Sequence, residues 1–439
     1  MKKGFFSKAI ILAATLISAV TAYAQDGAYS GFTPYSIFAV GDLMNQGSAY
    51  HAGMAGVGVA TRNKRYINYM NPAAVTARDS LSFMADMSLL QSNKVFSQND
   101  IKSVNNTFNI SSVAMSFPIY KSSAIMFGLA PYSSTGYGCY TVEDDPMLIE
   151  DTGGLYYSST GQGSLFQLFG AFGVTFWDRL SLGVQLNQYI GNIQKNNKLD
   201  FINSAFSDVS SGSNLILRGT TGKFGLQYEQ PLGKNLTLGL GATYKTGAPM
   251  KGYSQDYQFA VAAVQTDTLR YSVDTLKSSN NVRFANEFAV GISLNSGDRW
   301  RAEVDYSRSD WTNTGVSTAT GFAVHGKSSF SATCAESLRA GFEIVPNRND
   351  IRYYLRRCAY RVGAYKETSY YMMDGNKVNS FGITFGGTLP VFQYYNGVIW
   401  AVDLGQRGTT AQNMIRERYV KFTIGFNFFD YWFRKTRLN

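Results

Sequence analysis

The stretch YVKFTIGFNF, residues 419–428, alternates polar or small residues with apolar ones without interruption. Successive side chains of a β-strand point to opposite faces, so this stretch predicts a strand with one wholly apolar face. The same alternation recurs at residues 236–243, 287–294 and 398–405. We therefore predict an all-β protein.

The amino-acid composition further limits the class of protein to which the chain can belong. Its 439 residues are 45% hydrophobic, 15% aromatic and only 16% charged, whereas charged residues make up about a quarter of an ordinary soluble domain. Such a chain is too aromatic and too poor in charge to be disordered. After the N-terminus, no apolar run reaches the roughly 18 residues of a spanning helix, which excludes a helical membrane protein.

The N-terminus carries an export signal. Lysines at positions 2, 3 and 8 precede an apolar run over residues 9–20, and the small-residue site Ala22-Tyr23-Ala24 follows it. This pattern predicts a signal peptide over residues 1–24. At the other end we expect residues 431–439 to form a basic periplasmic tail, either solvated or serving to anchor a partner.

Periodicity alone does not distinguish a membrane barrel from a soluble sandwich, but the lengths of the connections between strands do. We predict fourteen strands near residues 81–90, 107–119, 122–133, 163–176, 179–192, 214–230, 235–248, 282–296, 299–312, 332–345, 356–369, 377–390, 397–406 and 416–429. Short turns alternate with long polar loops at residues 137–161, 194–213, 250–281 and 313–329. Short periplasmic turns opposite long external loops are typical of outer-membrane barrels. Residues 80–430 are therefore predicted to form a transmembrane antiparallel β-barrel in the outer membrane of a Gram-negative cell.

The segment ahead of the first strand, residues 25–79, lacks alternation and is rich in Ala and Gly between positions 49 and 60. Small residues allow a backbone to pack closely against lumen side chains. We therefore predict that this segment is a hatch inside the barrel.

At this point the chain resembles the FadL-type outer-membrane transporters of hydrophobic compounds. The resemblance rests on the small-residue stretch 49–58, on Asn71-Pro72-Ala73-Ala74, on Ala130-Pro131 and on Asp305-Tyr306 followed by Trp311. The C-terminal run over residues 404–435 resembles the variant found in Bacteroidota.

The resemblance implies a 14-stranded barrel with an N-terminal hatch and passive uptake of fatty-acid-like or aromatic molecules through the barrel wall. The alternative is that the barrel is a non-transporting subunit of an outer-membrane protein secretion or assembly complex.

The Asn71-Pro72-Ala73 motif is a candidate hatch element. Pro72 fixes φ and lacks an N–H, and the Asn71 side chain can bond to the nearby backbone, which predicts a rigid turn between hatch and first strand. The alternative interpretation is an ordinary turn.

A cluster of charged residues is expected on the inward faces of neighbouring strands. Its members are Glu287, Arg301, Glu303, Asp305, Arg339 and Glu343. Opposite charges on adjacent strands attract one another, and a lumen screens them less than bulk water does. The cluster is expected to be either a salt-bridged lumen wall or a polar clasp that holds the hatch.

Catalysis finds little support in the sequence. The chain has two histidines, His51 and His325, and its Gly53-x-x-Gly56-x-Gly58 pattern lacks the Gly-Lys-Ser/Thr of a phosphate loop. We predict no enzyme, cofactor or metal site; a membrane-embedded Ser/His hydrolase is the remaining alternative. Nucleic acid is not an expected partner, because no reading motif is present and the chain is exported.

The expected partners are outer-membrane lipid and lipopolysaccharide, a hydrophobic small molecule, and other outer-membrane or periplasmic proteins. Cys334 and Cys358 are predicted at opposite ends of neighbouring strands and Cys139 in a loop, so no internal disulfide is expected.

Overall fold

A computed structural model describes residues 31–431 apart from 80, 121, 144, 204, 262–265, 276–281, 320, 323, 325–327, 392–395 and 413. The predicted signal peptide, the tail beyond Tyr431 and His325 lie outside the described residues. Within them, no helix has the length and hydropathy required to cross a membrane.

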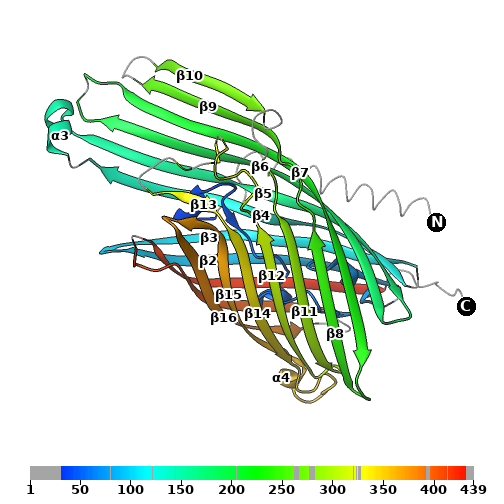
Figure 1. The fold of residues 1–439 in the computed structure, drawn as a ribbon. Helices are drawn as coiled ribbons and strands as arrows, with labels where there is room; N and C mark the ends of the chain where they lie inside the picture. The colour runs from blue at the N-terminus through cyan, green and yellow to red at the C-terminus, as the bar shows by residue number, and fades with distance from the viewer. Residues whose placement is uncertain are drawn as a thin grey trace, which may run out of the picture.

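Fourteen antiparallel strands form a closed barrel, as predicted (Figure 1). In spatial order they are β2 (Ser82–Gln98), β3 (Ile101–Tyr120), β4 (Ser123–Val142), β5 (Leu155–Phe176), β6 (Leu180–Phe201), β7 (Asp208–Pro231), β8 (Leu236–Lys245), β11 (Asn286–Ser296), β12 (Trp300–Asp310), β14 (Cys334–Ile344), β15 (Ala359–Met373), β16 (Asn376–Pro390), β17 (Gly397–Arg407) and β18 (Arg416–Tyr431). The barrel closes where β18 pairs with β2, from Arg416 opposite Ser97 to Tyr431 opposite Ser82.

The two ends of the barrel differ in their connections. At the turn end, the strands are joined by residues 121–122, 177–179, 232–235, 297–299, 345–358 and 391–396. One of these connections is longer and carries α4 (Tyr354–Arg357). The opposite end, the extended end, carries α3 (Pro146–Thr152) and β13 (Phe330–Ala332).

The predicted long loops are largely wrong at the extended end. Residues 137–142 and 155–161 continue β4 and β5, and residues 194–201 and 208–213 continue β6 and β7. The predicted loop 250–281 contains β9 (Lys251–Val261), which pairs with β7, and β10 (Thr266–Thr275), which pairs with β9. These strands project beyond the barrel as a sheet at the upper left of Figure 1. Hydrogen bonding between neighbouring strands outweighs the loop-like Ser, Asn and Gly content of these segments.

Strands β3 and β4 pair along only part of their length. Their register runs from Tyr120 opposite Ser123 to Val113 opposite Leu129. Beyond Leu129, β4 instead pairs with the two-residue strand β1 (Asp42–Leu43) of the N-terminal segment. The wall is thus split between β3 and β4 on the side of the extended end.

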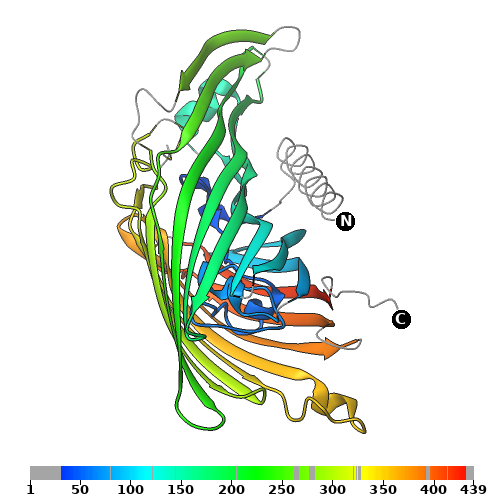
Figure 2. The same ribbon diagram turned by 90° about the vertical axis from the view of Figure 1, so that its right-hand side faces the viewer.

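Residues 31–79, hereafter the hatch, lie inside the barrel, where Figure 2 shows them in blue. Besides β1, they form η1 (Pro34–Ile37), α2 (Ala49–Ala52) and η2 (Pro72–Thr76). Helix η1 packs against β4, α2 against β16 to β18, and η2 against β4 to β7. The hydrophobic core therefore lies between the hatch and the inner wall rather than between two sheets.

Inward-facing glycines make room for the hatch at one level of the wall. A Cβ at Gly183 would lie 2.2 Å from the carbonyl carbon of Pro72, and one at Gly425 would lie 2.5 Å from the Ala49 Cβ. The glycines that meet hatch atoms in this way, hereafter the glycine belt, are Gly173, Gly183, Gly225, Gly241, Gly291, Gly341, Gly363, Gly386 and Gly425. The hatch backbone thus fills notches that any larger residue would close.

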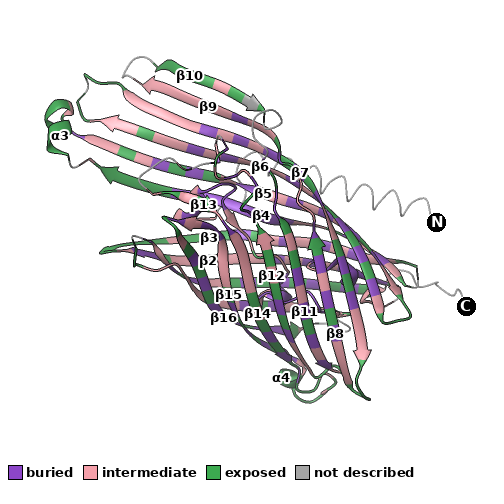
Figure 3. Cartoon of the chain, viewed as in Figure 1, coloured by how far each residue is buried: buried purple, intermediate pink, exposed green. Residues whose placement is uncertain are grey.

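Exposure alternates along the strands, as Figure 3 shows. On β18, Phe422 and Ile424 are exposed, whereas Thr423 and Asn427 are buried. This confirms the outward apolar face predicted from residues 419–428.

An arginine on this outward face should impair assembly. In a transmembrane barrel, a mid-membrane Arg costs about 2–4 kcal/mol. We expect Ile424→Arg to reduce the yield of heat-modifiable barrel strongly, while Thr423→Arg, facing the lumen beside Lys421 and Ala401, reduces it less. Equal yields from the two variants would contradict the face assignment.

Candidate functional site

Two carboxylates of β12 hold the middle of the hatch. Asp305 accepts hydrogen bonds from the backbone N–H groups of Gly58 at 2.7 Å and Val59 at 2.9 Å. Glu303 accepts from the backbone N–H of Ala60 at 2.9 Å and from the hydroxyl of Thr61. Both carboxylates are buried. They lie two positions apart on one strand, so both face inward and meet consecutive hatch residues.

Two arginines of the predicted cluster also bond to the hatch. Arg301 donates to the carbonyl of Arg62 at 2.8 Å and to the Tyr50 hydroxyl at 3.2 Å. Arg339 donates to the carbonyl of Ala55 at 3.2 Å. Four of the six predicted residues therefore contact the hatch, mainly through its backbone.

The other two members pair with wall residues outside the cluster. Glu287 lies 2.5 Å from the Lys245 ammonium, and Glu343 lies 2.7 Å from the Arg361 guanidinium. Arg361 also stacks over the ring of Tyr50 in the hatch, at 4.3 Å from its centroid. We expected the six residues to pair with one another, but both of these glutamates pair with residues outside the cluster. Arg361 was missed, although its inward position follows from the alternation along β15.

The Asn71-Pro72-Ala73 motif forms the start of η2. The Asn71 side chain accepts from the Ala73 N–H at 3.0 Å and donates to the carbonyls of Val59 at 2.7 Å and Leu226 at 3.2 Å. It thus joins its own turn, the middle of the hatch and the wall strand β7. Because Asn71 is fully buried, each of these bonds replaces one to water.

The first part of the hatch, residues 31–44, lies along the free edge of β4 and is called the strap. The N–H groups of Thr33 and Met44 donate to the carbonyls of Gly136 and Tyr132, at 2.8 and 2.9 Å. The Gly136 N–H donates in turn to the Ser36 hydroxyl at 3.0 Å. The strap therefore supplies hydrogen-bond partners that β3 does not supply to this part of β4.

One ion pair and one hydrogen bond fix the strap to the opposite wall. Asp42 lies 2.8 Å from Arg407 on β17. Thr33 donates to Glu417 on β18 at 2.8 Å, and Lys94 on β2 lies 2.7 Å from the same carboxylate. The strap is thus held on both sides of the split between β3 and β4.

An aromatic layer covers the hatch toward the extended end. Trp311, Val316, Ala319 and Phe322 are buried. The carbonyl of Phe322 accepts from the Ala39 N–H at 3.1 Å. The predicted external loop 313–329 therefore places some of its side chains against the hatch, while others, such as Asn313 and Thr318, are exposed. The buried aromatic residues of the layer are Tyr35, Phe38, Tyr132, Tyr189, Phe284, Trp311, Phe322, Tyr370 and Tyr371.

Histidine 51 is an internal element of the hatch. Its Nδ1 accepts from the Ser48 N–H at 3.2 Å at the start of α2. Burial, together with the charges of Arg361 and Arg301, lowers the pKa of His51 to about 3. The imidazole is therefore held in its neutral form.

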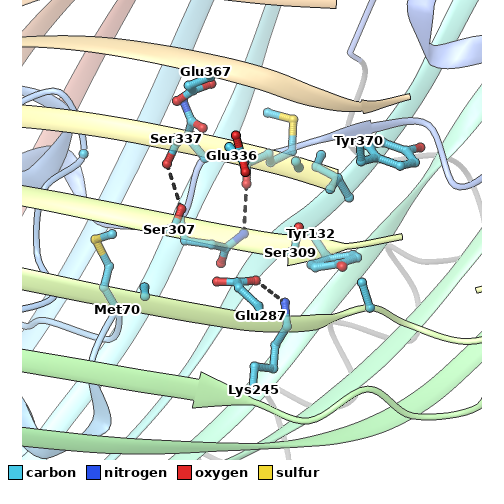
Figure 4. Close-up of a pocket in the computed structure, with 18 of the residues that line it drawn as sticks. Met70, Tyr132, Lys245, Glu287, Ser307, Ser309, Glu336, Ser337, Glu367 and Tyr370 are labelled. Atoms are coloured by element: carbon cyan, nitrogen blue, oxygen red, sulfur yellow. Dashed lines mark hydrogen bonds and ion pairs between the residues drawn. The ribbon is translucent and has the colours of Figure 1, made fainter. Parts of the chain in front are cut away.

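Two cavities between the described parts of hatch and wall have linings that combine charged with apolar residues. Their volumes are about 210 and 120 Å³, below the roughly 300–1,000 Å³ of pockets that bind small ligands. Figure 4 shows Lys245 and Glu287 paired in the larger cavity, beside Ser307 and Ser337. The charged residues that line it are Asp42, Lys223, Lys245, Glu287, Asp305, Glu336, Arg339, Glu367 and Arg407.

The three cysteines, Cys139, Cys334 and Cys358, are all free. Cys334 begins β14 and Cys358 directly precedes β15, so these two lie at opposite ends of neighbouring strands, as predicted. Cys139 lies within β4, not in the predicted loop.

Solved structures with the same fold include hydrocarbon channels. The toluene transporter TodX of P. putida aligns with a TM-score of 0.56 at 13% identity, over 89% of this chain and 100% of that chain. The toluene transporter TbuX of Ralstonia pickettii aligns at 0.54 and 13% identity, over 87% and 98%. A FadL homologue of Pseudomonas aeruginosa aligns at 0.54 and 10% identity, over 90% and 99%. No curated protein matches the chain significantly.

These alignments establish a FadL-like fold, and the closed barrel is located in the outer membrane. The model of the BamG family matches residues 6–439, and the chain therefore belongs to the BamG family.

Proposed function

We propose that this barrel is a sealed, non-transporting subunit of an outer-membrane protein assembly or secretion complex. The observation that carries the proposal is the way the lumen is filled. Carboxylates and arginines hold the hatch through its backbone, and the two cavities described above are small and carry several charged residues in their linings. Entry of an apolar solute would cost free energy, because it would remove water from these charged groups. The match to the BamG family adds weight to this role.

Passive uptake of fatty-acid-like or aromatic molecules is the second candidate. The split between β3 and β4 favours it, together with the fold shared with the toluene transporters TodX and TbuX. In this chain the strap occupies the edge of β4 at the split. Uptake would therefore require displacement of the strap. Neither candidate assigns a catalytic role to the chain, and the likeness to the Bacteroidota variant stays a prediction.

Purification of the native barrel and measurement of solute uptake distinguish the complex subunit from the transporter. An affinity tag inserted beside α3, at the extended end, should recover the barrel from mildly solubilised outer membranes with partner proteins in fixed stoichiometry. Depletion of the chain should lower the amounts of other outer-membrane barrels while uptake of labelled toluene and oleate stays unchanged. Recovery of the barrel alone, with a loss of toluene or oleate uptake on depletion, would favour the transporter and refute the subunit.

A further inference from the structure

The longest connection at the turn end, residues 345–358, is an ordered unit, hereafter the arginine loop. The Asp350 carboxylate accepts from the N–H groups of Arg352 at 2.9 Å and Tyr353 at 2.8 Å. The Asn347 N–H donates to the carbonyl of Arg356 at 2.8 Å, which closes the loop on itself. The side chains of the arginine loop are therefore presented from a fixed backbone.

The arginine loop folds toward the lipid-facing side of the wall. Tyr360 points outward from β15, and its hydroxyl donates to the carbonyl of Leu355 at 2.9 Å. Ile344 and Trp400, also exposed on the outer surface, lie on β14 and β17 at the same end. Tyr and Trp on the outer wall mark the membrane–water interface in barrels. Helix α4 projects from the rim at the bottom of Figures 1 and 2.

The arginine loop exposes both apolar and positively charged side chains. Ile351 is 99% exposed and Leu355 69% exposed. Three arginines of the segment, at positions 352, 356 and 357, are exposed or half-exposed, and its one acidic residue, Asp350, lies 3.4 Å from the Arg356 guanidinium. The Arg356 guanidinium lies 4.8 Å from the centroid of the Tyr353 ring and that of Arg357 lies 5.7 Å from the Tyr354 ring. The stacking orients planar guanidinium groups, which bind phosphate through paired N–H donors.

We propose that the arginine loop binds the headgroups of anionic phospholipids in the periplasmic leaflet. Short turns face the periplasm in outer-membrane barrels, so the loop lies at the phospholipid leaflet. Ile351 and Leu355 enter the acyl boundary, and Arg352 and Arg357 bind the phosphates. Anchorage to the outward-facing Tyr360 favours a lipid over a soluble protein, because it places the loop beside the bilayer rather than below the lumen. The site is independent of whether the barrel transports or assembles.

Lipid retention tests the site. Purified wild-type barrel would be equilibrated in detergent with phosphatidylglycerol or phosphatidylcholine, and bound lipids counted by native mass spectrometry. We expect a preference for phosphatidylglycerol that falls roughly 25-fold in Arg352→Gln/Arg357→Gln, since each arginine near an anionic lipid surface contributes about fivefold. The control Arg179→Gln/Lys234→Gln removes two exposed charges from other turns at the same end and should retain the preference.

Equal losses in the two variants would show general charge attraction and overturn the site. No change in the arginine-loop variant would overturn it as well, as would loss of a co-purifying acidic protein while phosphatidylglycerol retention stays intact. Ile351→Ser/Leu355→Ser should weaken retention of both lipids, because it removes the apolar contact and leaves the arginines. Heat-modifiability checks that each variant has folded.

Discussion

Deleting hatch residues 32–66 is expected to convert a closed barrel into an ion-conducting pore. The deletion leaves all fourteen barrel strands in the chain and removes only the two β1 pairs with β4 from the sheet. Water would fill the vacated lumen and solvate the charged wall residues. In planar bilayers, the intact protein should show no channel steps, and the deletion variant should show stable open-channel currents. Cells carrying it should also become sensitive to large hydrophilic antibiotics.

The control for this deletion removes α3, residues 146–152, which lies outside the lumen at the extended end. That variant should stay closed. A hatch deletion that folds, as judged by heat-modifiability, and yet conducts no more than the α3 deletion would show that residues 32–66 do not close the barrel.

Replacing the two acidic side chains of β12 by amides should loosen the hatch without removing it. Glu303→Gln/Asp305→Asn keeps the size of each side chain but replaces one of its two oxygens by an NH2 group, which accepts no hydrogen bond. A buried donor that loses its acceptor costs about 1–3 kcal/mol, and four hatch donors bond to these two side chains. We expect brief, frequent channel openings and faster proteolysis within residues 58–61, with barrel yield maintained.

The matched control for this pair is Glu287→Gln. Glu287 is a carboxylate of the adjacent strand β11 that pairs with Lys245 on the wall. The Glu287→Gln variant should show the same currents in planar bilayers as the wild type. Indistinguishable currents from the double variant and this control would mean that Glu303 and Asp305 do not hold the hatch.

The sequence predicted the barrel wall better than its contents. Alternation placed Phe422 outside and Thr423 inside because a strand has only two faces, and the same rule turned Glu303 and Asp305 inward. It could not show that they would bond to Gly58, Val59 and Ala60, because a backbone N–H has no sequence signature. The partners of the charged wall residues depend on which part of the hatch lies against each strand. The sequence of a single strand does not contain this information.

The extended end was misread for a different reason. Ser, Asn and Gly in residues 194–213 are typical of loops, yet the long pairing of β6 with β7 continues from Gln194 opposite Asn214 to Leu199 opposite Val209. The alternating Leu269, Tyr271 and Val273 of β10 carried a strand signal that the overall polarity of the segment obscured. Pairing with a neighbour, rather than local composition, decides the structure of such segments.

The glycine belt bears on the order of events during biogenesis. The hatch backbone lies in notches on strands from β5 round to β18. Sliding it in along the barrel axis would drive it against larger inward side chains next to several notches, such as Gln185, Arg339 and Tyr365. The hatch precedes β2 in the chain, and the seam between β2 and β18 joins the first and last strands of the wall. This favours a pathway in which the nascent wall curls around the hatch as a template and the seam forms last. A hatch synthesised as a separate polypeptide should then fail to seal a barrel that has already closed.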